Sequence, residues 1–312
     1  MTLDLLGDRL RSELSGRVER DFPLRRLTTY RLGGPAAIYV EPADEGDLEL
    51  LGAALRSVGE VQTLPLGRGS NLVVSDDGFP GLVLRLGAQW SWIRAEEGVS
   101  QVRAGAATPL PQLANWTARR GLAGAEFMIA IPGSVGGAVR MNAGAHGGDV
   151  SKVLAGARIF NLDRLEVENR GVGQLDYSYR SSNLSERDVV LDASFAFDAE
   201  DAAEVRNRME SFRAHRAETQ PGATQNAGSV FKNPPGESAG RLVEAAGLKG
   251  FSVGGASVSQ LHANFFMARD GATAQDVYDL VHEVRARVGR AAGIELEPEI
   301  RFIGSFRQTS TR

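Results

Sequence analysis

The sequence has no cysteine, three lysines and four histidines among its 312 residues. Without cysteine the chain cannot form a disulfide framework, a thiol nucleophile or a zinc–cysteine site. There is no apolar run of about 18 residues and no apolar N-terminal segment typical of a secretion signal. We therefore expect a cytoplasmic protein without a membrane partner. The histidines are too scattered to argue for a metal site, and no metal is expected: His146, His215, His262 and His282.

A basic surface is also lacking, because the formal net charge is −4 at pH 7. A nucleic-acid-binding protein would need a basic stripe, so no nucleic-acid partner is expected. The hydrophobic fraction of 42% and the charged fraction of 24% are typical of a globular protein. With 312 residues, the chain is long enough for two or three domains.

The most unusual segment is the run from Ile131 to Ala145, which has four glycines and almost no charge. Glycine costs backbone entropy and gives no packing in return, so we expect neither a core helix nor an ordinary strand here. The bare N–H groups of such a run suit a phosphate. A second glycine-rich turn lies upstream, at Gly67 to Leu72. The two turns together suggest two walls of one dinucleotide site.

Neither turn matches a standard nucleotide-binding motif. A Rossmann fingerprint requires G-x-G-x-x-G with an acidic residue about twenty positions on. Leu72 stands where the third glycine of the upstream turn should be, the spacing of the downstream run is wrong, and no P-loop motif occurs. Taken alone, each run is better explained as a tight turn.

Hydrophobic periodicity predicts both helices and strands. Leu3, Leu6, Leu10 and Leu14 predict an amphipathic helix, and a capping box from Thr273 to Asp276 predicts a helix through Val277 to Val288. Short strands mixed with occasional helices indicate an α+β fold and not regular βαβ units. Further helices are expected over 47–58, 109–120, 198–220 and 239–246, and strands over 61–66, 82–86, 153–163, 165–168, 189–197 and 294–302.

Five motifs follow one another along the chain: YRLGGPA (30–36), GRGSNLVV (67–74), IPGSVGGAVRMNAGA (131–145), AGSVFKNP (227–234) and LEPEIRFIG (296–304). In this order they resemble the UDP-N-acetylenolpyruvoylglucosamine reductase family, flavoenzymes that complete UDP-N-acetylmuramate for bacterial cell walls. The resemblance implies a two-lobed FAD-binding domain of the PCMH/vanillyl-alcohol-oxidase type, not a Rossmann fold, and a C-terminal α+β substrate domain. The expected parts are 1–85 and 86–205 for the FAD-binding lobes, 206–304 for the substrate domain and 305–312 for a tail.

The resemblance also implies the ligands, which are non-covalent FAD, NADPH as co-substrate and the enolpyruvyl ether of UDP-N-acetylglucosamine. We expect the protein to act as a monomer. The residues expected to bind FAD belong to the two glycine-rich runs: Gly67, Arg68, Gly69, Ser70, Asn71, Leu72, Pro132, Gly133, Ser134, Val135, Gly136, Gly137, Asn142, Ala143, Gly144 and Ala145. Those expected to bind substrate are Lys232, Asn233, Lys249 and His262.

Three residues are candidates for catalysis through the resemblance. Glu299 lies on the acidic face of the predicted strand over 294–302; such a face is usually just solvated, but the resemblance makes Glu299 the catalytic glutamate. Ser229 has no G-x-S-x-G context and is by itself an ordinary turn serine, to which the resemblance assigns proton donation to a carbanion. Arg180 is by itself a surface arginine; in the family pattern Y-R-x-S it binds the substrate carboxylate, which its planar fork suits.

Other assignments stay open. Lys232 and Asn233 either support Ser229 or bind the substrate diphosphate, and His262 either faces substrate or is structural. His146 stands where the family usually has tyrosine, and we expect no covalent flavin link there. Thr219 stands where the family commonly has the lysine of a K-x-P string.

Arg213 or Arg216 is the candidate replacement for that lysine. Two other functions compete with the reductase. One is another oxidoreductase on the same flavin-binding fold, such as an alcohol or aldehyde oxidase. The other is a flavin- or nucleotide-sugar-binding protein without catalysis. An oxidase has no need for Ser229 and Glu299 together, and the presence of Arg180, Ser229 and Glu299 argues against a binding protein without catalysis.

Overall fold

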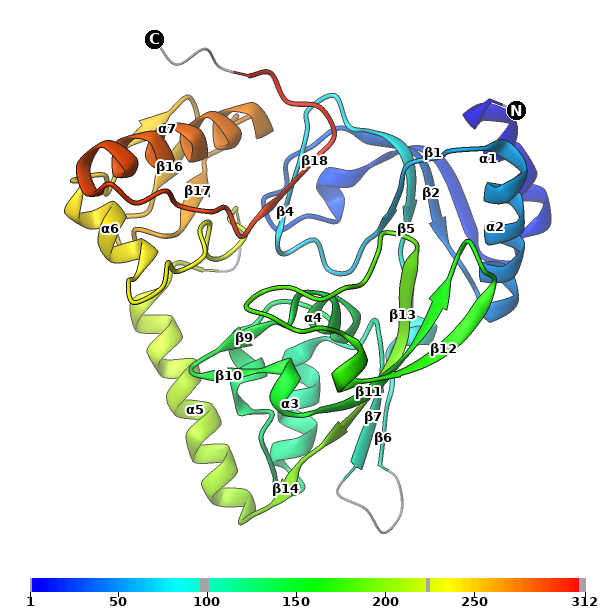
Figure 1. The fold of residues 1–312 in the computed structure, drawn as a ribbon, viewed down its shortest axis with the longest axis horizontal. Helices are drawn as coiled ribbons and strands as arrows, with labels where there is room; N and C mark the ends of the chain where they lie inside the picture. Colours follow the sequence, from blue (N-terminus) through cyan, green and yellow to red (C-terminus); the bar gives the residue numbers. More distant parts are fainter. Residues whose placement is uncertain (1, 96–100, 223–224, 309–312) are drawn as a thin grey trace. The chain divides into compact units, whose positions relative to one another are not determined.

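The computed structural model describes residues 2–95, 101–222 and 225–308, and the chain forms two compact units (Figure 1). The first unit takes the described residues of Met1–Asp21, Ile38–Arg68 and Gly81–Arg216. The second takes those of Phe22–Ala37, Gly69–Pro80 and Ala217–Arg312. Neither unit is one continuous stretch of sequence. The division into two FAD-binding lobes and a substrate domain stays a prediction.

The N-terminal part of the first unit pairs helix α1 (Leu3–Glu13) with helix α2 (Glu45–Val58). Leu6 and Leu10 of α1 are fully buried, which confirms the predicted amphipathic helix. Asp44 caps α2 by accepting a hydrogen bond from the Asp47 N–H. One four-stranded sheet has the order β1-β2-β5-β3. Its strands are β1 (Arg17–Pro23), β2 (Pro35–Glu41), β5 (Phe79–Leu84) and β3 (Thr63–Pro65).

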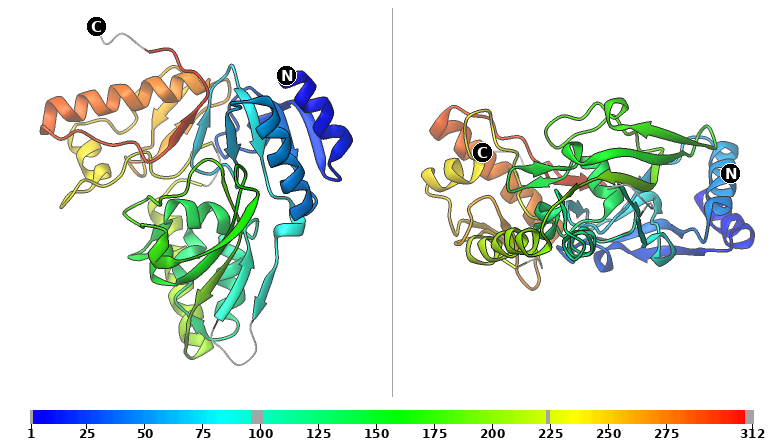
Figure 2. Two further views of the ribbon diagram at one scale, coloured as in Figure 1. Left: turned by 45° about the vertical axis from the view of Figure 1, so that its right-hand side comes forward. Right: turned by 90° about the horizontal axis from the view of Figure 1, so that it is seen from below.

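The first unit also contains a five-stranded antiparallel sheet in the order β12-β11-β13-β7-β6, visible from three sides in Figures 1 and 2. The central strand β13 is almost entirely buried. The strands predicted over 153–163, 165–168 and 189–197 are confirmed with shifted ends. The observed strands are β12 (Glu166–Gly171), β11 (Leu154–Asn161), β13 (Asp188–Ala196), β7 (Gln101–Gly105) and β6 (Ile93–Ala95).

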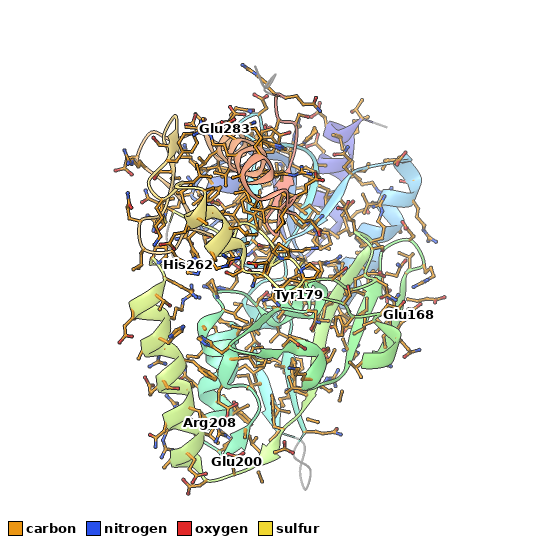
Figure 3. All side chains as sticks on the ribbon, turned by 60° about the vertical axis from the view of Figure 1, so that its left-hand side comes forward. Glu168, Tyr179, Glu200, Arg208, His262 and Glu283 are labelled. Carbon is orange, nitrogen blue, oxygen red and sulfur yellow. The ribbon has the colours of Figure 1, made fainter. Side chains whose placement is uncertain are left out.

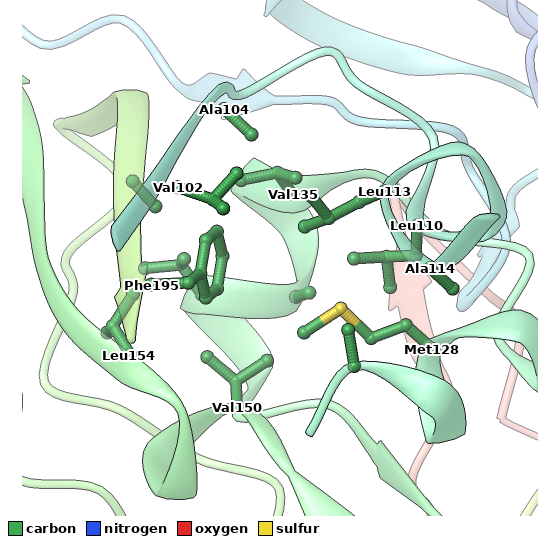
Figure 4. Packing of buried hydrophobic residues seen from close by; sticks show 14 of the residues in the cluster. Val102, Ala104, Leu110, Leu113, Ala114, Met128, Val135, Val150, Leu154 and Phe195 are labelled. Carbon is green, nitrogen blue, oxygen red and sulfur yellow. The ribbon is translucent and has the colours of Figure 1, made fainter. Parts of the chain in front are cut away.

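Helix α4 (Val135–Met141) packs on this sheet, and helix α3 (Leu110–Ala118) contributes to the same buried apolar cluster. Helix α4 lies within the glycine-rich run, so the expectation that this run could not be a core helix was wrong. Val135, on α4, points into the same apolar cluster as Phe195 of β13 (Figure 4). Two glycines cost a helix about 1 kcal/mol each. Burial of three apolar side chains of α4 outweighs that cost: Val135, Ala138 and Val139.

Helix α5 (Ala202–Thr219) ends the first unit and carries the chain into the second. The predicted helix over 198–220 is confirmed but begins later, because β14 (Asp198–Ala199) pairs with β8 (Leu122–Ala123). Arg208 of α5 pairs with Glu200 at 2.6 Å and with Glu126 at 2.8 Å, and Figure 3 shows Arg208 and Glu200 at one end of the helix.

In the second unit, helix α7 (Ala274–Ala292) packs against the sheet β15-β16-β17, and helix α6 (Ala239–Ala245) packs against α7. The capping box of Thr273 and Asp276 is present at the start of α7, as predicted. The three strands are β15 (Ser252–Val253), β16 (Ala256–Val258) and β17 (Phe266–Ala268). A separate parallel pair joins β18 (Arg301–Ile303) to β4 (Leu72–Val74).

The last strand is shorter than predicted. Only Arg301–Ile303 form β18, so the strand expected from residue 294 was wrong over most of its length. Pro298 makes only an isolated bridge to Phe231, because a proline has no N–H to donate to a ladder. The alternation itself is partly present, since Leu296 and Ile300 are buried and Glu297 is exposed.

Small elements complete the fold. Strands β9 (Gly144–Ala145) and β10 (Gly148–Asp149) form a hairpin. Among the described residues no helix combines the length and the apolar character needed to span a membrane. The mixture of antiparallel sheets and helices confirms the α+β class. The short 3-10 helices are η1 (Leu24–Arg26), η2 (Ala88–Trp90), η3 (Glu126–Ala130), η4 (Val150–Lys152) and η5 (Val172–Gln174).

Candidate functional site

The first unit contains a pocket to which both glycine-rich runs contribute. Gly67 and Arg68 come from the upstream turn. Ser134, Gly136 and Gly137 come from the start of α4. The sequence predicted that the two runs would wall one site, and within this unit these residues do line one pocket. Its other lining residues are Pro65, Leu66, Leu84, Arg85, Leu86, Ala106, Ala107, Arg140, Asp188, Val189 and Val190.

The glycines of this pocket differ in how much space surrounds their backbone. A Cβ on Gly67 would lie 2.8 Å from the Ser134 hydroxyl oxygen, so the two runs touch there. Gly136 packs on Ala106: its N–H donates to the Ala106 carbonyl at 2.8 Å, and a Cβ would lie 3.0 Å from the Ala106 Cβ. A Cβ on Gly137 would meet only Ser134 Oγ, at 3.7 Å. Of these three glycines, Gly137 therefore has the most free space around its backbone.

Charged residues that the sequence analysis did not select line the same pocket. Arg140, the one charge in the glycine-rich run, donates to the carbonyls of Leu184, Ser185 and Asp188. The Asp188 carboxylate is buried and accepts hydrogen bonds from Asn161 and Ser185. Burial alone would raise the pKa of Asp188, but these hydrogen bonds and the charge of Arg170 lower it overall.

The rest of the upstream turn belongs to the second unit and has structural contacts there. Gly69 has φ +60°, and a Cβ on it would lie 2.1 Å from the Leu27 carbonyl oxygen. The Asn71 amide donates to the Glu299 carbonyl at 3.1 Å, and the Asn71 carbonyl accepts from the Arg301 N–H at 3.0 Å. Leu72 begins β4. Asn71 thus holds the main chain at Glu299.

The remaining downstream residues that were expected to bind FAD lie at or near the two ends of α4. The Gly133 carbonyl, next to Pro132, accepts from the Leu110 N–H, and Val135 is buried in the core. Asn142 ends the helix in a left-handed conformation, and the Ala143 N–H returns to the Ala138 carbonyl. Gly144 and Ala145 form β9.

Arg180 lies at the tip of a tight turn in the first unit. Ser178 and Ser181 exchange two main-chain hydrogen bonds of 3.2 Å around it. Arg180 has φ +57°, which is uncommon for a residue with a side chain and is found where surrounding contacts impose it. Its guanidinium donates to the Gly144 carbonyl at 2.6 Å and lies 4.9 Å from the ring of Tyr179, which Figure 3 labels.

The same loop is fixed to the C-terminal end of α4. The Tyr177 hydroxyl donates to the Val139 carbonyl at 2.7 Å, and the Ser182 hydroxyl donates to the Arg140 carbonyl at 2.6 Å. The Asn142 amide donates to the Ser178 carbonyl. Helix carbonyls at a C-terminus lack partners within the helix, and these side chains supply them. Helix α4 therefore contributes to the pocket at its start and supports the Arg180 loop at its end.

The second unit brings Ser229 and Glu299 onto neighbouring segments. Ser229 bridges to Phe265 on one side of its segment. On the other side the Glu299 N–H donates to the Val230 carbonyl at 2.7 Å, and the Lys232 N–H donates to the Glu297 carbonyl. Two of the three predicted catalytic residues therefore lie on adjacent extended segments of one unit.

Four residues predicted to bind substrate also lie in the second unit. Lys232 pairs with Glu297 at 2.6 Å, and Lys249 pairs with Glu244 at 2.7 Å. The Asn233 side-chain oxygen Oδ1 accepts from the Ala239 N–H at the start of α6.

His262, labelled in Figure 3, accepts the Asn264 N–H at Nδ1, and burial lowers its pKa. The geometry gives Asn233 and His262 structural contacts and leaves a role in substrate binding a prediction.

His146 lies at the turn of the β9–β10 hairpin. Its ring stacks on Phe212 of α5 at 4.4 Å, and its pKa is lowered by burial and by the charges of His215 and Arg216. Arg213 pairs with Glu210, whereas Arg216 donates to the Ala130 carbonyl. Of the two candidate replacements for the family lysine, Arg216 is therefore the one that has no carboxylate partner among the described residues.

Two family models match the chain. The FAD binding domain matches residues 36–163, and the UDP-N-acetylenolpyruvoylglucosamine reductase C-terminal domain matches residues 220–303. The UDP-N-acetylenolpyruvoylglucosamine reductase 2 of Symbiobacterium thermophilum is 47% identical over 305 residues, covering 96% of this chain and 97% of the relative. The reductase of Geobacter sulfurreducens is 41% identical over 301 residues, covering 96% and 99%.

A solved structure gives the same result. The crystal structure of UDP-N-acetylenolpyruvylglucosamine reductase from Thermus caldophilus superposes with a TM-score of 0.80 at 35% identity, covering 93% of this chain and 100% of that one. The predicted resemblance and fold class are confirmed, with an FAD-binding part followed by a reductase C-terminal domain. The chain belongs to the UDP-N-acetylenolpyruvoylglucosamine reductase family of FAD-dependent oxidoreductases.

Proposed function

We propose that this protein uses FAD and NADPH to reduce the enolpyruvyl ether of UDP-N-acetylglucosamine to UDP-N-acetylmuramate, a precursor of peptidoglycan. Family membership gives the reaction class. The observation that carries the proposal is the first unit's pocket, in which both glycine-rich runs meet at the start of α4, while the C-terminal end of the same helix is bonded to the loop of Arg180. Both ligands of the reaction are cytoplasmic metabolites, so we place the reaction in the cytoplasm.

The residues of the pocket fit FAD. Gly67 and Gly137 line it without a bulky side chain, and Ser134 adds a hydroxyl, a combination that suits a diphosphate. Leu84, Val189 and neighbouring apolar residues offer a surface for a flat ring. Bound FAD supplies hydride, which it takes from NADPH.

Arg180 would bind the substrate carboxylate. Hydride added to the terminal vinyl carbon leaves negative charge on the adjacent carbon and its carboxylate. A guanidinium can pair with that planar anion through two hydrogen bonds. The left-handed turn and the Gly144 carbonyl fix the arginine before substrate arrives, so less ordering is required during the reaction.

Ser229 would complete the reduction by giving its hydroxyl proton to the adjacent carbon. A serine is a weak acid, so it needs a neighbour that stabilises and reprotonates its oxygen. We assign that task to Glu299, together with polarisation of the carboxylate. Lys232, Lys249, Asn233 and His262 would contact the nucleotide-sugar part of the substrate, with the lysines released from Glu297 and Glu244.

The proposal is tested on the purified protein. We expect FAD to be released on denaturation, and NADPH oxidation to depend on the enolpyruvyl substrate. Mass spectrometry should find a product heavier than the substrate by two hydrogen atoms. UDP-N-acetylglucosamine, which lacks the enolpyruvyl group, is the control and should give no product. A protein that binds no FAD, or oxidises NADPH without forming this product, would contradict the proposal.

A further inference from the structure

Asn264 lies beside the segment of Ser229 and is not among the residues assigned so far. Its side chain is 3% exposed. Its amide makes two hydrogen bonds to one residue: Oδ1 accepts from the Phe231 N–H at 2.9 Å, and Nδ2 donates to the Phe231 carbonyl at 2.8 Å. A buried amide that satisfies both the N–H and the C=O of one residue makes the same two bonds as a neighbouring strand would and fixes the main chain at that residue.

The main chain of Asn264 extends the same contact. Its carbonyl accepts from the Val230 N–H at 2.8 Å, and the next residue, Phe265, bridges to Ser229. Val230 and Phe231 are therefore hydrogen-bonded on this side, Ser229 lies opposite Phe265, and only the Phe231 bonds come from a side chain. Phe231 itself is 1% exposed and packs edge-on against Phe266 at 5.8 Å.

The opposite side of residues 229–231 carries Glu299. Its N–H donates to the Val230 carbonyl at 2.7 Å, and Pro298 bridges to Phe231. Residues 229–231 are thus the middle one of three neighbouring segments, and the Asn264 amide holds them from one side. Ser229 belongs to that segment, and Glu299 is bonded to it.

We infer that Asn264 is a positioning residue whose buried amide sets the location of the Ser229 hydroxyl. The inference rests on the proposed function. Proton transfer to carbon depends closely on distance, and a displacement of about 1 Å can cost roughly 100-fold in rate. Without the amide, Phe231 would lose its two bonds on this side, and Ser229, two residues away, would be held only by the main-chain contacts of Val230 and Phe265.

The test compares single-turnover rates in the FAD-loaded holoenzyme. Wild-type protein and Asn264→Ala are reduced with NADPH and then mixed with the enolpyruvyl ether of UDP-N-acetylglucosamine. We expect roughly 100-fold slower reoxidation in the variant and an unchanged rate of flavin reduction. Rates of the FAD-loaded fraction are compared, so partial unfolding changes the amplitude and not the rate. Asn264→Asp is the second variant, because it keeps the volume and replaces the donor to the Phe231 carbonyl by an oxygen, which when ionised also places a negative charge against that carbonyl.

A double variant separates positioning from general damage. In a Ser229→Ala background, Asn264→Ala should slow reoxidation less than tenfold, because the group that it positions is already absent. Gln275→Glu is the matched control, since Gln275 makes the same kind of two-bond amide contact to Arg307 on the C-terminal segment. It should leave reoxidation within twofold of wild type.

Three results would overturn the inference: unchanged reoxidation in both Asn264 variants, equal slowing of flavin reduction, or the full 100-fold loss in the Ser229→Ala background. Failure of the wild-type protein to be reoxidised by this substrate would instead refute the proposed function.

Discussion

Replacement of Gly137 by leucine should weaken FAD binding without harming the fold. A Cβ at this position meets only Ser134 Oγ, at 3.7 Å, so the ligand-free protein has room for it. Leucine is also a better helix former than glycine by up to about 1 kcal/mol, so α4 should not lose stability. The added side chain would project into the pocket lined by Gly67 and Ser134.

The magnitude follows from the cost of forcing extra volume into a filled space. Overpacking typically costs about 1–3 kcal/mol, which corresponds to roughly 5- to 150-fold weaker FAD binding. The assay is titration of the ligand-free protein with FAD by calorimetry or flavin fluorescence. Thermal unfolding without FAD, measured in parallel, should show a Tm no lower than that of wild type.

Two other glycines serve as controls. A Cβ on Gly136 would lie 3.0 Å from the Ala106 Cβ, so Gly136→Leu should lower the Tm of the ligand-free protein as well. A Cβ on Gly173 would meet nothing within 4 Å, so Gly173→Ala should change neither quantity. Gly137→Leu protein that binds FAD as tightly as wild type would show that the cofactor does not occupy this pocket.

Three further substitutions test other parts of the account. Arg180→Lys should slow reduction of the enolpyruvyl substrate by about 3–4 kcal/mol in transition-state free energy, by analogy with loss of an oxyanion donor, and unaltered turnover would remove Arg180 from the site. Asp188→Asn should lower stability near pH 7 by about 1–3 kcal/mol, because charged hydrogen bonds are lost. The folded-state pKa of Asp188 is lowered, so this stabilisation is fully present above the unfolded pKa of about 3.9 and disappears as the pH falls through the folded-state pKa. A difference in Tm between the variant and wild type that does not change with pH would contradict this. Thr273→Ala should cost about 1 kcal/mol in denaturant unfolding through loss of the α7 cap, whereas an unchanged midpoint would show the cap to be unimportant.

Local sequence patterns predicted those helices that are determined by the residues within the helix itself. Helix α7 combines a capping box with a continuous apolar stripe, and Leu6 and Leu10 of α1 are buried as their spacing predicts. Helix α4 could not be predicted in this way, because its glycines argue against a helix. Its stability comes from buried neighbours such as Phe195, which are remote in sequence.

The candidate site shows the same limit. The glycine-rich runs were visible in the sequence, and Gly67 and Gly137 line one pocket, while their role in binding FAD stays a prediction. Asp188 gave no signal, because an aspartate at the start of a strand is ordinary. Asn264 gave none either, since its importance depends on the peptide of Phe231, which lies 33 residues earlier. Arg140 had a usable signal as the one charge in an otherwise uncharged run.

The central claim is that Ser229 and Glu299 act in reduction of the enolpyruvyl group and not in oxidation of NADPH. Anaerobic stopped-flow measurement of the two half-reactions in Ser229→Ala tests it most directly. The account predicts flavin reduction by NADPH at the wild-type rate and reoxidation by the enolpyruvyl substrate slowed by about 10²–10⁴-fold, the usual contribution of a positioned acid. Glu299→Gln should behave similarly. Slowed flavin reduction with normal reoxidation in either variant would contradict the account and assign that residue to NADPH binding.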